Sequence, residues 1–302
     1  MEGRKFVIMN NVKGSTREWC RPLAAIVVFA SLVVLGFFVA SAIESVPVTK
    51  PTAAPTPSPI STEKALGFLP SVEAGSSAAG KTTLVFSDEF NGTELDSSKW
   101  GSGRYAATTA GDAPFNPHLE AAYYASSQVT EANGNLYLTL APSKAVLDGK
   151  AYSYSSGMIQ SEGHFALTPG TYIESRVKIN SCDGCWNAFW AQPSKKWPPE
   201  IDIFEFFQPD SAPRFNFHPE SGLENGPASY GQKNASYLDE FHTYGMYWDG
   251  HLATPYLDGT PYLPQPAGTE IPLYVIFNLT VYDGHSPPAG SNMVIDWVRA
   301  WR

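Results

Sequence analysis

Residues 81–302 are predicted to form an all-β fold, an antiparallel β-sandwich or barrel, and three features of the sequence support this. Short segments alternate apolar and polar residues, as half-buried strands do. No long stretch of this region has helical periodicity. Turn-forming pairs separate the segments, at Asn133-Gly134, Asp148-Gly149, Asp249-Gly250, Asp258-Gly259 and Asp283-Gly284. A sandwich of this size can curve one sheet into a groove.

Four segments carry the strand pattern most clearly. NLYLTL at 135–140 places its three leucines on one face, and TYIESRVKI at 171–179 places Ile173, Val177 and Ile179 on one face. The other face of 171–179 is long and polar, which fits either the wall of a wet groove or an ordinary solvent face. Residues 272–281 and 293–301 are predicted to be further strands.

The first 80 residues are predicted to lie outside the folded domain. Residues 22–43 contain no charged side chain over 22 positions, enough for a membrane-spanning helix of about 20 residues. Five Lys and Arg residues within 1–21 favour a cytoplasmic N-terminal segment. Residues 44–80 are rich in Pro, Ser, Ala and Gly, which is typical of a linker. The folded domain is therefore expected at 81–302, outside the cytoplasm.

Two interpretations of 22–43 remain, a retained signal-anchor and a cleaved signal peptide. Ala40-Ser41-Ala42 is similar to a cleavage site. The apolar stretch is nevertheless longer than the usual signal-peptide core of about 7 to 15 residues. The protein is accordingly expected to be either membrane-anchored or secreted.

Charge and cysteine content limit the partners of the domain. Residues 81–302 hold 13 Lys and Arg against 24 Asp and Glu, a net charge of −11. Nucleic acids and anionic glycans are poor partners for such a surface. Cys182 and Cys185 form a C-x-x-C pair that, outside the cytoplasm, is expected to close a local disulfide. We expect a monomer.

The stretch EIDIFEFF at 200–207 poses a conflict that a β-bulge resolves. In a regular strand Glu205 would point away from Glu200 and Asp202, into the apolar core. Burying an unpartnered carboxylate is costly. One extra residue near Ile203 or Phe204 would shift the register, so that all three carboxylates share one face.

Three carboxylates on one face repel one another unless one of them holds a proton, and the raised pKa suits a general acid. Glycoside hydrolysis uses such a pair of carboxyl groups. Trp186, Trp190 and Trp197 lie within 14 residues of Glu200, and aromatic side chains stack on sugar rings. A solvated edge strand, or a metal site made by the same groups, would also account for the three carboxylates.

With these residues in view, the sequence resembles glycoside hydrolase family 16, the laminarinase-type β-glycanases. EIDIFE resembles the bulged form of the E-x-D-x-x-E signature of that family, and NAFWAQP and WPP resemble the stretches before it. SDEFNG at 87–92, SGMIQS at 156–161, FHTYGMYWDG at 241–250 and IDWVRAW at the end match in order. The resemblance implies a jelly-roll sandwich with a concave substrate-binding cleft.

The resemblance also implies residue roles. Glu200 would be the nucleophile, Glu205 the general acid/base and Asp202 the assisting carboxylate of a retaining mechanism. Further matches are the substrate-binding positions Trp190, Trp197, Asn116, Arg176 and His218. Catalysis would need no cofactor. Many family members hold a structural calcium ion, and Asp296 matches its carboxylate ligand, with SDEFNG as the source of further oxygen ligands.

The implied activity is retaining endo-hydrolysis of a neutral β-linked polysaccharide, with β-1,3-glucan or mixed-linkage glucan favoured. Pro199 replaces the usual glycine before the first glutamate, and CDGC replaces the usual glycine-rich lead-in. Both departures adjoin the donor side of the cleft, so β-galactan stays open as a substrate. Two further functions stay open as well, a transglycosylase of the same fold and a non-catalytic glycan-binding module.

Overall fold

The computed structural model describes residues 77–104, 111–221, 225–231 and 236–302. The chain divides into Met1–Glu63 and Lys64–Arg302, and only the second unit contains described residues. The predicted cytoplasmic segment, the apolar segment 22–43 and nearly all of the linker therefore lie outside the described residues. Within the described ranges, no helix is long and apolar enough to span a membrane.

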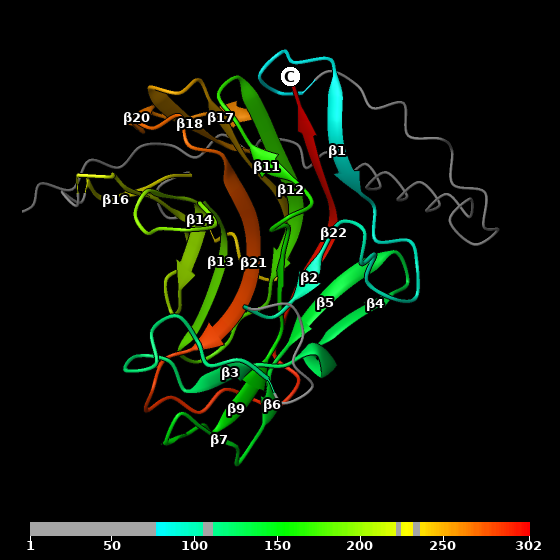
Figure 1. Cartoon of the computed structure of the whole chain (residues 1–302). Coiled ribbons are helices and arrows are strands. Elements are labelled where there is room, and N and C mark those ends of the chain that lie inside the picture. The colour runs from blue at the N-terminus through cyan, green and yellow to red at the C-terminus, as the bar shows by residue number, and fades with distance from the viewer. Residues whose placement is uncertain (1–76, 105–110, 222–224, 232–235) are drawn as a thin grey trace, which may run out of the picture. The chain divides into compact units, whose positions relative to one another are not determined.

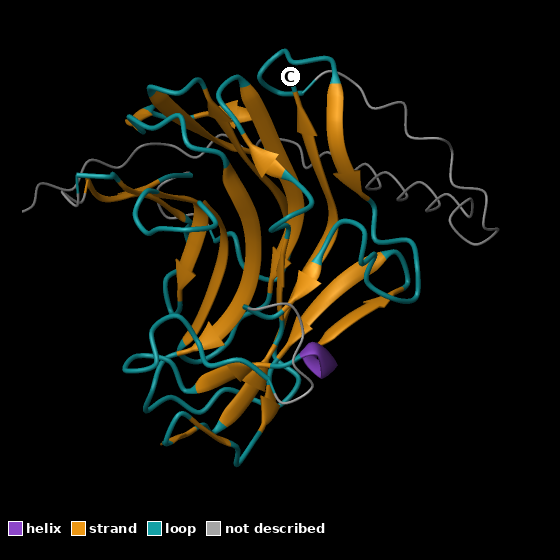
Figure 2. Cartoon of the chain, viewed as in Figure 1, coloured by secondary structure: helices purple, strands orange, loops and turns teal. Residues whose placement is uncertain are grey.

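Two large antiparallel sheets make up most of the described structure (Figures 1 and 2). The first sheet has nine strands. In spatial order they are β19 (Thr260–Pro261), β18 (Leu252–Leu257), β17 (Phe241–Trp248), β12 (Thr171–Ile179), β22 (Asn292–Trp301), β5 (Asn135–Thr139) and β4 (Val129–Ala132), with β1 (Leu84–Asp88) on β22 and β20 (Gln265–Pro266) on β18.

The second sheet has eight strands. In spatial order they are β16 (Asn225–Ser229), β15 (Arg214–His218), β14 (Glu200–Phe207), β13 (Cys185–Gln192), β21 (Leu273–Val281), β10 (Met158–Gln160) and β2 (Gly101–Ser102), with β11 (Ala166–Leu167) on β21. Smaller pieces complete the described structure: β3 (Ala122–Tyr124), β9 (Tyr154–Ser156) and β6 (Ala141–Pro142) form one small sheet, β7 (Val146–Leu147) and β8 (Lys150–Ala151) another, and Ser126–Gln128 is a short 3₁₀ turn. The all-β antiparallel prediction is confirmed, with one parallel pair, β3 with β9.

The core lies between the two large sheets. Phe204 on β14 and Tyr244 on β17 face each other across it, with ring centroids 4.6 Å apart. The predicted inward residues of β5 and β12 are fully buried in the same cluster. Burial of these apolar faces stabilises the sandwich by roughly 25 cal/mol per Å² removed from water. The fold is an antiparallel sandwich of jelly-roll type.

The predicted hairpin turns occur where strands reverse. Asn133 and Gly134 both have positive φ (54° and 72°) and join β4 to β5. Asp258 and Gly259 (48° and 74°) join β18 to β19 in the same way. Two consecutive residues with positive φ match the twist of antiparallel strands, and this is why Asn-Gly and Asp-Gly predict such turns.

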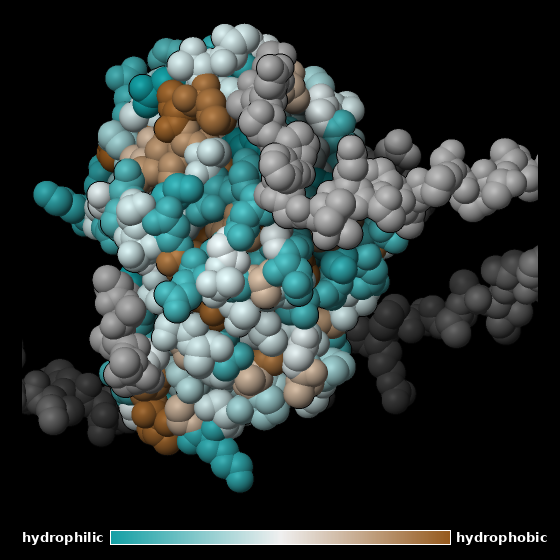
Figure 3. Space-filling model, turned by 90° about the vertical axis from the view of Figure 1, so that its right-hand side faces the viewer, coloured by the Kyte–Doolittle hydropathy of each residue, from teal (hydrophilic) through white to brown (hydrophobic). Residues whose placement is uncertain are grey.

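The polar face of β12 is an ordinary outer face and not a groove wall. It belongs to the nine-stranded sheet and points away from the core, with Glu174, Arg176 and Lys178 partly exposed. One exception on this face is Tyr172, which is buried against Tyr256 and Trp301. Figure 3 shows the side of the molecule near β1 and β4, where the atoms not drawn in grey are mostly hydrophilic and the hydrophobic residues form small patches.

Candidate active site

Strand β14 contains the predicted bulge. Its neighbour β13 pairs Phe189 with Phe204 and Trp190 with Asp202, so Ile203 is the extra residue. The bulge places Ile201, Ile203, Phe204 and Phe206 in the core. The other face of β14 therefore presents Glu200, Asp202, Glu205 and Phe207 to one groove.

That groove lies on the eight-stranded sheet and has a volume of about 840 Å³. Strands β13, β14, β15 and β21 form its floor. Figure 1 shows that β21 is a curved strand. Among the sequence-predicted residues, the groove is lined by Asn116, Trp190, Trp197, Glu200, Asp202, Glu205 and His218. Seven of the eight residues predicted to be catalytic or substrate-binding thus come together from separate parts of the chain.

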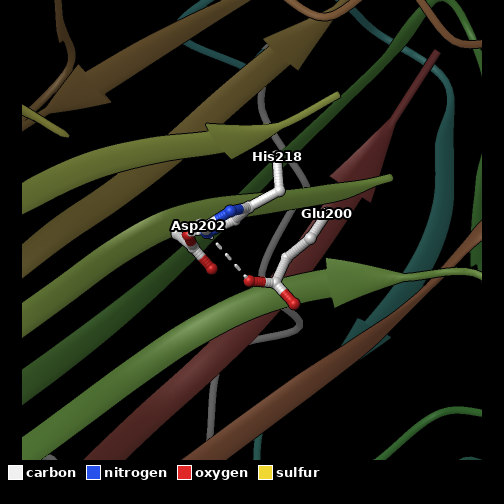
Figure 4. Close-up of side chains that lie close together, drawn as sticks. All are labelled: Glu200, Asp202 and His218. Carbon is white, nitrogen blue, oxygen red and sulfur yellow. Dashed lines mark ion pairs between the residues drawn. The ribbon is translucent and has the colours of Figure 1, made fainter. Parts of the chain in front are cut away.

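Glu200 is held by two neighbours. Trp197 donates its indole N–H to Oε2 of Glu200 at 2.8 Å. Nε2 of His218, on the adjacent strand β15, lies 3.3 Å from Oε1 (Figure 4). Burial and the charge of Asp202 raise the pKa of Glu200 well above its usual range, while His218 and Trp197 act in the opposite direction.

Asp202 is the most deeply buried of the three carboxylates, with 3% of its surface exposed. Its Oδ2 lies 3.5 Å from Nε2 of His218 but has no hydrogen-bond partner among the described residues. Burial and the charge of Glu205 raise the pKa of Asp202 well above its usual range. Both effects favour the neutral form of Asp202, and a proton on this carboxyl would relieve the repulsion within the group.

Glu205 has a different partner. Trp186 donates its indole N–H to Oε1 of Glu205 at 3.0 Å. Burial raises the pKa of Glu205, and the Trp186 hydrogen bond is the largest effect that lowers it. A carboxyl group with a raised pKa and a donor ready for its ionised form can give up a proton and take it back.

The two predicted tryptophans differ in exposure. Trp197 is 59% exposed at the rim of the groove, whereas Trp190 is 8% exposed and packs edge-on against Phe115 at 5.0 Å. Trp197 is therefore the ring most available for stacking on a sugar. Trp190 is mostly buried, so it contributes mainly to the wall of the groove.

Arg176 corrects the sequence prediction, because it does not line the groove. It lies on β12 in the other sheet, where it forms an ion pair with Asp296 of β22. Its guanidinium also stacks over Phe241 at 4.3 Å. The alternation of β12 correctly indicated a polar face, but that face belongs to the sheet without the groove.

The arrangement around Asp296 does not fit the expected calcium site. The Arg176 guanidinium forms an ion pair with Oδ2 of Asp296, and its positive charge would repel a cation. The SDEFNG carboxylates also have protein partners: Asp88 accepts the indole N–H of Trp100, and Glu89 pairs with Arg299. In the described residues, Asp296 belongs to no group of three His, Cys, Asp or Glu side chains that could share a metal ion.

A different set of donors could hold a metal ion. One oxygen each from Glu200 and Asp202 and one nitrogen of His218 all lie within 4.8 Å of one another. Figure 4 shows His218 reaching across from β15 toward the two carboxylates of β14. Two of the three groups, Glu200 and Asp202, already have roles in the predicted glycosidase mechanism, so their proximity has an explanation without a metal.

Cys182 and Cys185 are joined by a disulfide at the start of β13. The next residue is Trp186, so the bridge lies directly before the indole that contacts Glu205. The backbone N–H of Cys182 also donates to Gln208. The disulfide thus closes the turn that leads into the groove floor.

The structure adds Phe115, Asn216 and Tyr274 to the groove, which the sequence did not single out. It also places Trp186 there, which the sequence indicated only as one of three tryptophans near Glu200. Asn216 lies two residues before His218 on β15, and Trp186 lies four before Trp190 on β13. Side chains two or four residues apart in a strand share a face, so this spacing was a usable signal.

A curved sheet that presents three carboxylates beside indole rings in an open groove defines the protein as a glycoside hydrolase. More narrowly, the chain belongs to glycoside hydrolase family 16. The family model described as "Beta-porphyranase A-D, GH16 domain" matches residues 82–302. The resemblance inferred from the motifs is confirmed.

Curated relatives are distant. Glucan endo-1,3-beta-glucosidase A1 of Niallia circulans is 27% identical over 263 residues, covering 72% of this chain and 38% of the relative. Beta-porphyranase E of Zobellia galactanivorans is 28% identical over 255 residues, covering 72% and 85%. The chain therefore spans well under half of the Niallia relative.

Solved structures agree on the fold. The endo-beta-1,3-glucanase of Pyrococcus furiosus superposes with a TM-score of 0.63 at 23% identity, covering 74% of this chain and 96% of that structure. The laminarinase catalytic domain of Thermotoga petrophila gives 0.63 at 22% identity, covering 73% and 97%. At these identities the likeness bears on the fold alone.

Proposed function

We propose that residues 81–302 are the catalytic domain of a retaining endo-β-glycosidase that cleaves a neutral polysaccharide, β-1,3-glucan or mixed-linkage glucan in the first place. The observation that carries the proposal is the bulge at Ile203, which brings Glu200, Asp202 and Glu205 onto one face of one groove. The named activity of the Niallia relative supports β-1,3-glucan.

In the proposed mechanism Glu200 attacks the anomeric carbon while Glu205 protonates the departing glycosidic oxygen. The carbon–oxygen bond breaks and a glycosyl ester forms on Glu200. Glu205, now ionised, removes a proton from a water molecule that attacks the same carbon. Hydrolysis of the ester restores both carboxyl groups, with the configuration retained.

The neighbours of each carboxylate support this division of roles. A nucleophile must be ionised, and Trp197 and His218 stabilise the charged form of Glu200. A protonated Asp202 removes a negative charge from beside it. The general acid must hold its proton before the reaction, and burial favours the neutral form of Glu205.

A β-galactan is the second candidate substrate. The family description names beta-porphyranases, and porphyranases E and B of Zobellia galactanivorans are covered over 85% and 82% of their length, more than twice the share of the Niallia relative. Arg104, Lys195 and Lys196 also line the groove, and Lys195 and Lys196 directly precede Trp197 in the sequence. Porphyran is therefore a polymer to test.

We further propose that the domain is displayed outside the membrane. The support is the uncharged stretch 22–43, the basic residues before it and the Pro-rich linker after it. Retention or cleavage of the N-terminal segment would distinguish an anchored from a secreted enzyme, and N-terminal sequencing of the mature protein separates the two.

Release of reducing ends by the full-length chain tests the function. The substrates are β-1,3-glucan, mixed-linkage glucan, porphyran and other β-galactans, and the control is Glu200→Gln. Release from one polymer that disappears in the control establishes the glycanase and its substrate. Binding without release points to a glycan-binding module, and longer products formed only when an acceptor is added point to a transglycosylase.

A further inference from the structure

Four buried side chains form a directed hydrogen-bond chain behind the groove. Trp190 donates its indole N–H to Oδ1 of Asn278 at 2.7 Å. Asn278 donates from Nδ2 to the hydroxyl of Tyr124 at 3.1 Å. Tyr124 donates in turn to Oε2 of Glu120 at 3.2 Å. None of the four is more than 8% exposed.

The chemistry of the Trp190 end fixes the direction of this chain. An indole N–H can only donate. Asn278 must therefore turn its oxygen to Trp190 and its amide nitrogen to Tyr124, and the Tyr124 proton must point to Glu120. A reversal at any step would leave a buried polar atom unpaired, which is unfavourable in a dry environment.

The same carboxylate also holds a second part of the groove. Oε1 of Glu120 accepts the backbone N–H of Asn116 at 2.7 Å. Asn116 and Trp190 both line the groove. Lys150 donates to the backbone carbonyl of Glu120 at 2.8 Å, which fixes this residue in turn. One buried carboxylate thus links two groove-lining elements that are distant in sequence.

We propose that Glu120 is a positioning residue, which acts through Tyr124 and Asn278 to fix the Trp190 ring and acts directly on the backbone of Asn116. Its role in turnover rests on the proposed glycosidase function, because the positioned groups would contact the sugar. Glu120 itself is 2% exposed and acts through these neighbours. A sugar ring held against a fixed indole stays aligned with the two catalytic carboxylates.

A spectroscopic test needs no catalysis. In full-length ¹⁵N-labelled protein, the Trp190 indole resonance is assigned by its disappearance in Trp190→Phe. Tyr124→Phe keeps the ring but breaks the chain, and Glu120→Gln keeps the shape but places an amide donor opposite a donor. In both variants we expect the Trp190 indole proton to shift upfield and to exchange faster with solvent.

Tyr172→Phe is the matched control. It breaks another tyrosine–carboxylate hydrogen bond, a partly buried one from Tyr172 to Oε2 of Glu174 at 2.6 Å, on the other sheet. The Trp190 resonance should be unchanged in this variant. An unshifted, equally protected Trp190 indole in both Tyr124→Phe and Glu120→Gln would overturn the proposal.

A kinetic test separates positioning from general stability. Tyr124→Phe should raise KM about 3- to 10-fold, the effect of one hydrogen bond. In a Trp190→Phe background, which lacks the indole donor, the same substitution should change KM by less than about twofold. Tyr172→Phe should lower Tm without changing KM. Equal effects of Tyr124→Phe in both backgrounds would contradict the proposal. If the wild type cleaves no polymer, the proposed function fails, and the resonance test alone decides the role of Glu120.

Discussion

Trp186 donates its indole N–H to Oε1 of Glu205 over 3.0 Å, and its ring stacks on Tyr282 with centroids 5.4 Å apart and planes 14° apart. The stack fixes the indole, and the indole fixes the carboxylate. Burial drives Glu205 toward its neutral form and this hydrogen bond toward its ionised form. The pair therefore balances the two states between which a general acid/base alternates.

Trp186→Phe tests this balance. The substitution keeps an aromatic ring beside Tyr282 but removes the donor to the ionised carboxylate, so the pKa of Glu205 rises further. Because Glu205 must be protonated in the first step, the alkaline limb of the kcat/KM profile should move to higher pH. Trp297→Phe, on the outer sheet beside Arg299, should leave the profile unchanged. An alkaline limb that stays in place or moves down would contradict the role of Trp186.

Glu200→Gln removes the proposed nucleophile. We expect kcat to fall by about 10⁴-fold or more, as is typical when a nucleophile is lost. The amide has nearly the same shape, so Tm and oligosaccharide binding should be retained. Glu94→Gln, at an exposed position outside the groove, should be as active as the wild type. Near wild-type turnover by Glu200→Gln would exclude Glu200 as the nucleophile.

Glu205→Ala removes the proposed acid/base. An aryl glycoside with a good leaving group can still form the glycosyl ester without proton donation, but the ester then hydrolyses slowly. Azide needs no general base, so it should restore turnover and yield a glycosyl azide of retained configuration. Product analysis by NMR identifies the anomer. Failure to detect any azide adduct, with the ester accumulating, would count against this assignment.

Asp202→Asn should stabilise the protein at neutral pH. The folded-state pKa of Asp202 is raised, mainly by burial, so its contribution to stability is present at low pH and is lost as pH rises through the folded pKa. Asparagine carries no charge at any pH and avoids this loss. The variant should match the wild type near pH 4 and have a higher Tm at pH 7, by about 2–4 °C for each kcal/mol, while turnover decreases.

Asp249→Asn provides the control of opposite sign. Asp249 accepts the backbone N–H groups of His251 and Leu252 at 2.7 Å each, and these bonds lower its pKa. Its stabilising effect is present above the unfolded pKa, so the substitution should lower Tm at pH 7. If Asp202→Asn also lowers Tm at pH 7, the neutral form of Asp202 is not the favoured one.

Arg176→Gln should leave glycan turnover within about twofold of the wild type, since surface changes away from a site have small effects. Its guanidinium pairs with Asp296 on the outer sheet and is absent from the groove. The measurement is KM on the polymer that the wild type cleaves best. Trp197→Ala, a substitution in the groove, should raise KM and serves as the comparison for Arg176→Gln. A large rise in KM for Arg176→Gln would contradict the placement of β12.

The three carboxylates proposed to act in catalysis could be predicted because they are close together in the sequence. Glu200, Asp202 and Glu205 lie on one strand, and a period-two strand allows only a bulge to bring them together without burying a charge in the core. Trp190 and Trp197 were within reach of the same reasoning because they precede that strand directly. The bulge at Ile203 is where the sequence required it.

The sequence did not reveal which face of which sheet a strand presents. The alternation of 171–179 showed a polar face, but only the pairing of β12 with β17 and β22 places that face outside the sandwich, with Arg176 on it. The hydrogen bond from Trp186 to Glu205 could not be predicted from the sequence for the same reason. It depends on the register between β13 and β14, which long-range pairing decides.

By itself, then, the sequence determined the all-β class, the positions of the turns and the bulged carboxylate strand, because these follow from periodicity and from the high cost of a buried charge. Only the tertiary structure decided which distant groups meet in the groove. Glu120, Tyr124, Trp190 and Asn278 contact one another in series although up to 158 positions separate them. No local pattern encodes such a chain, since its donors and acceptors become partners only after the strands have paired.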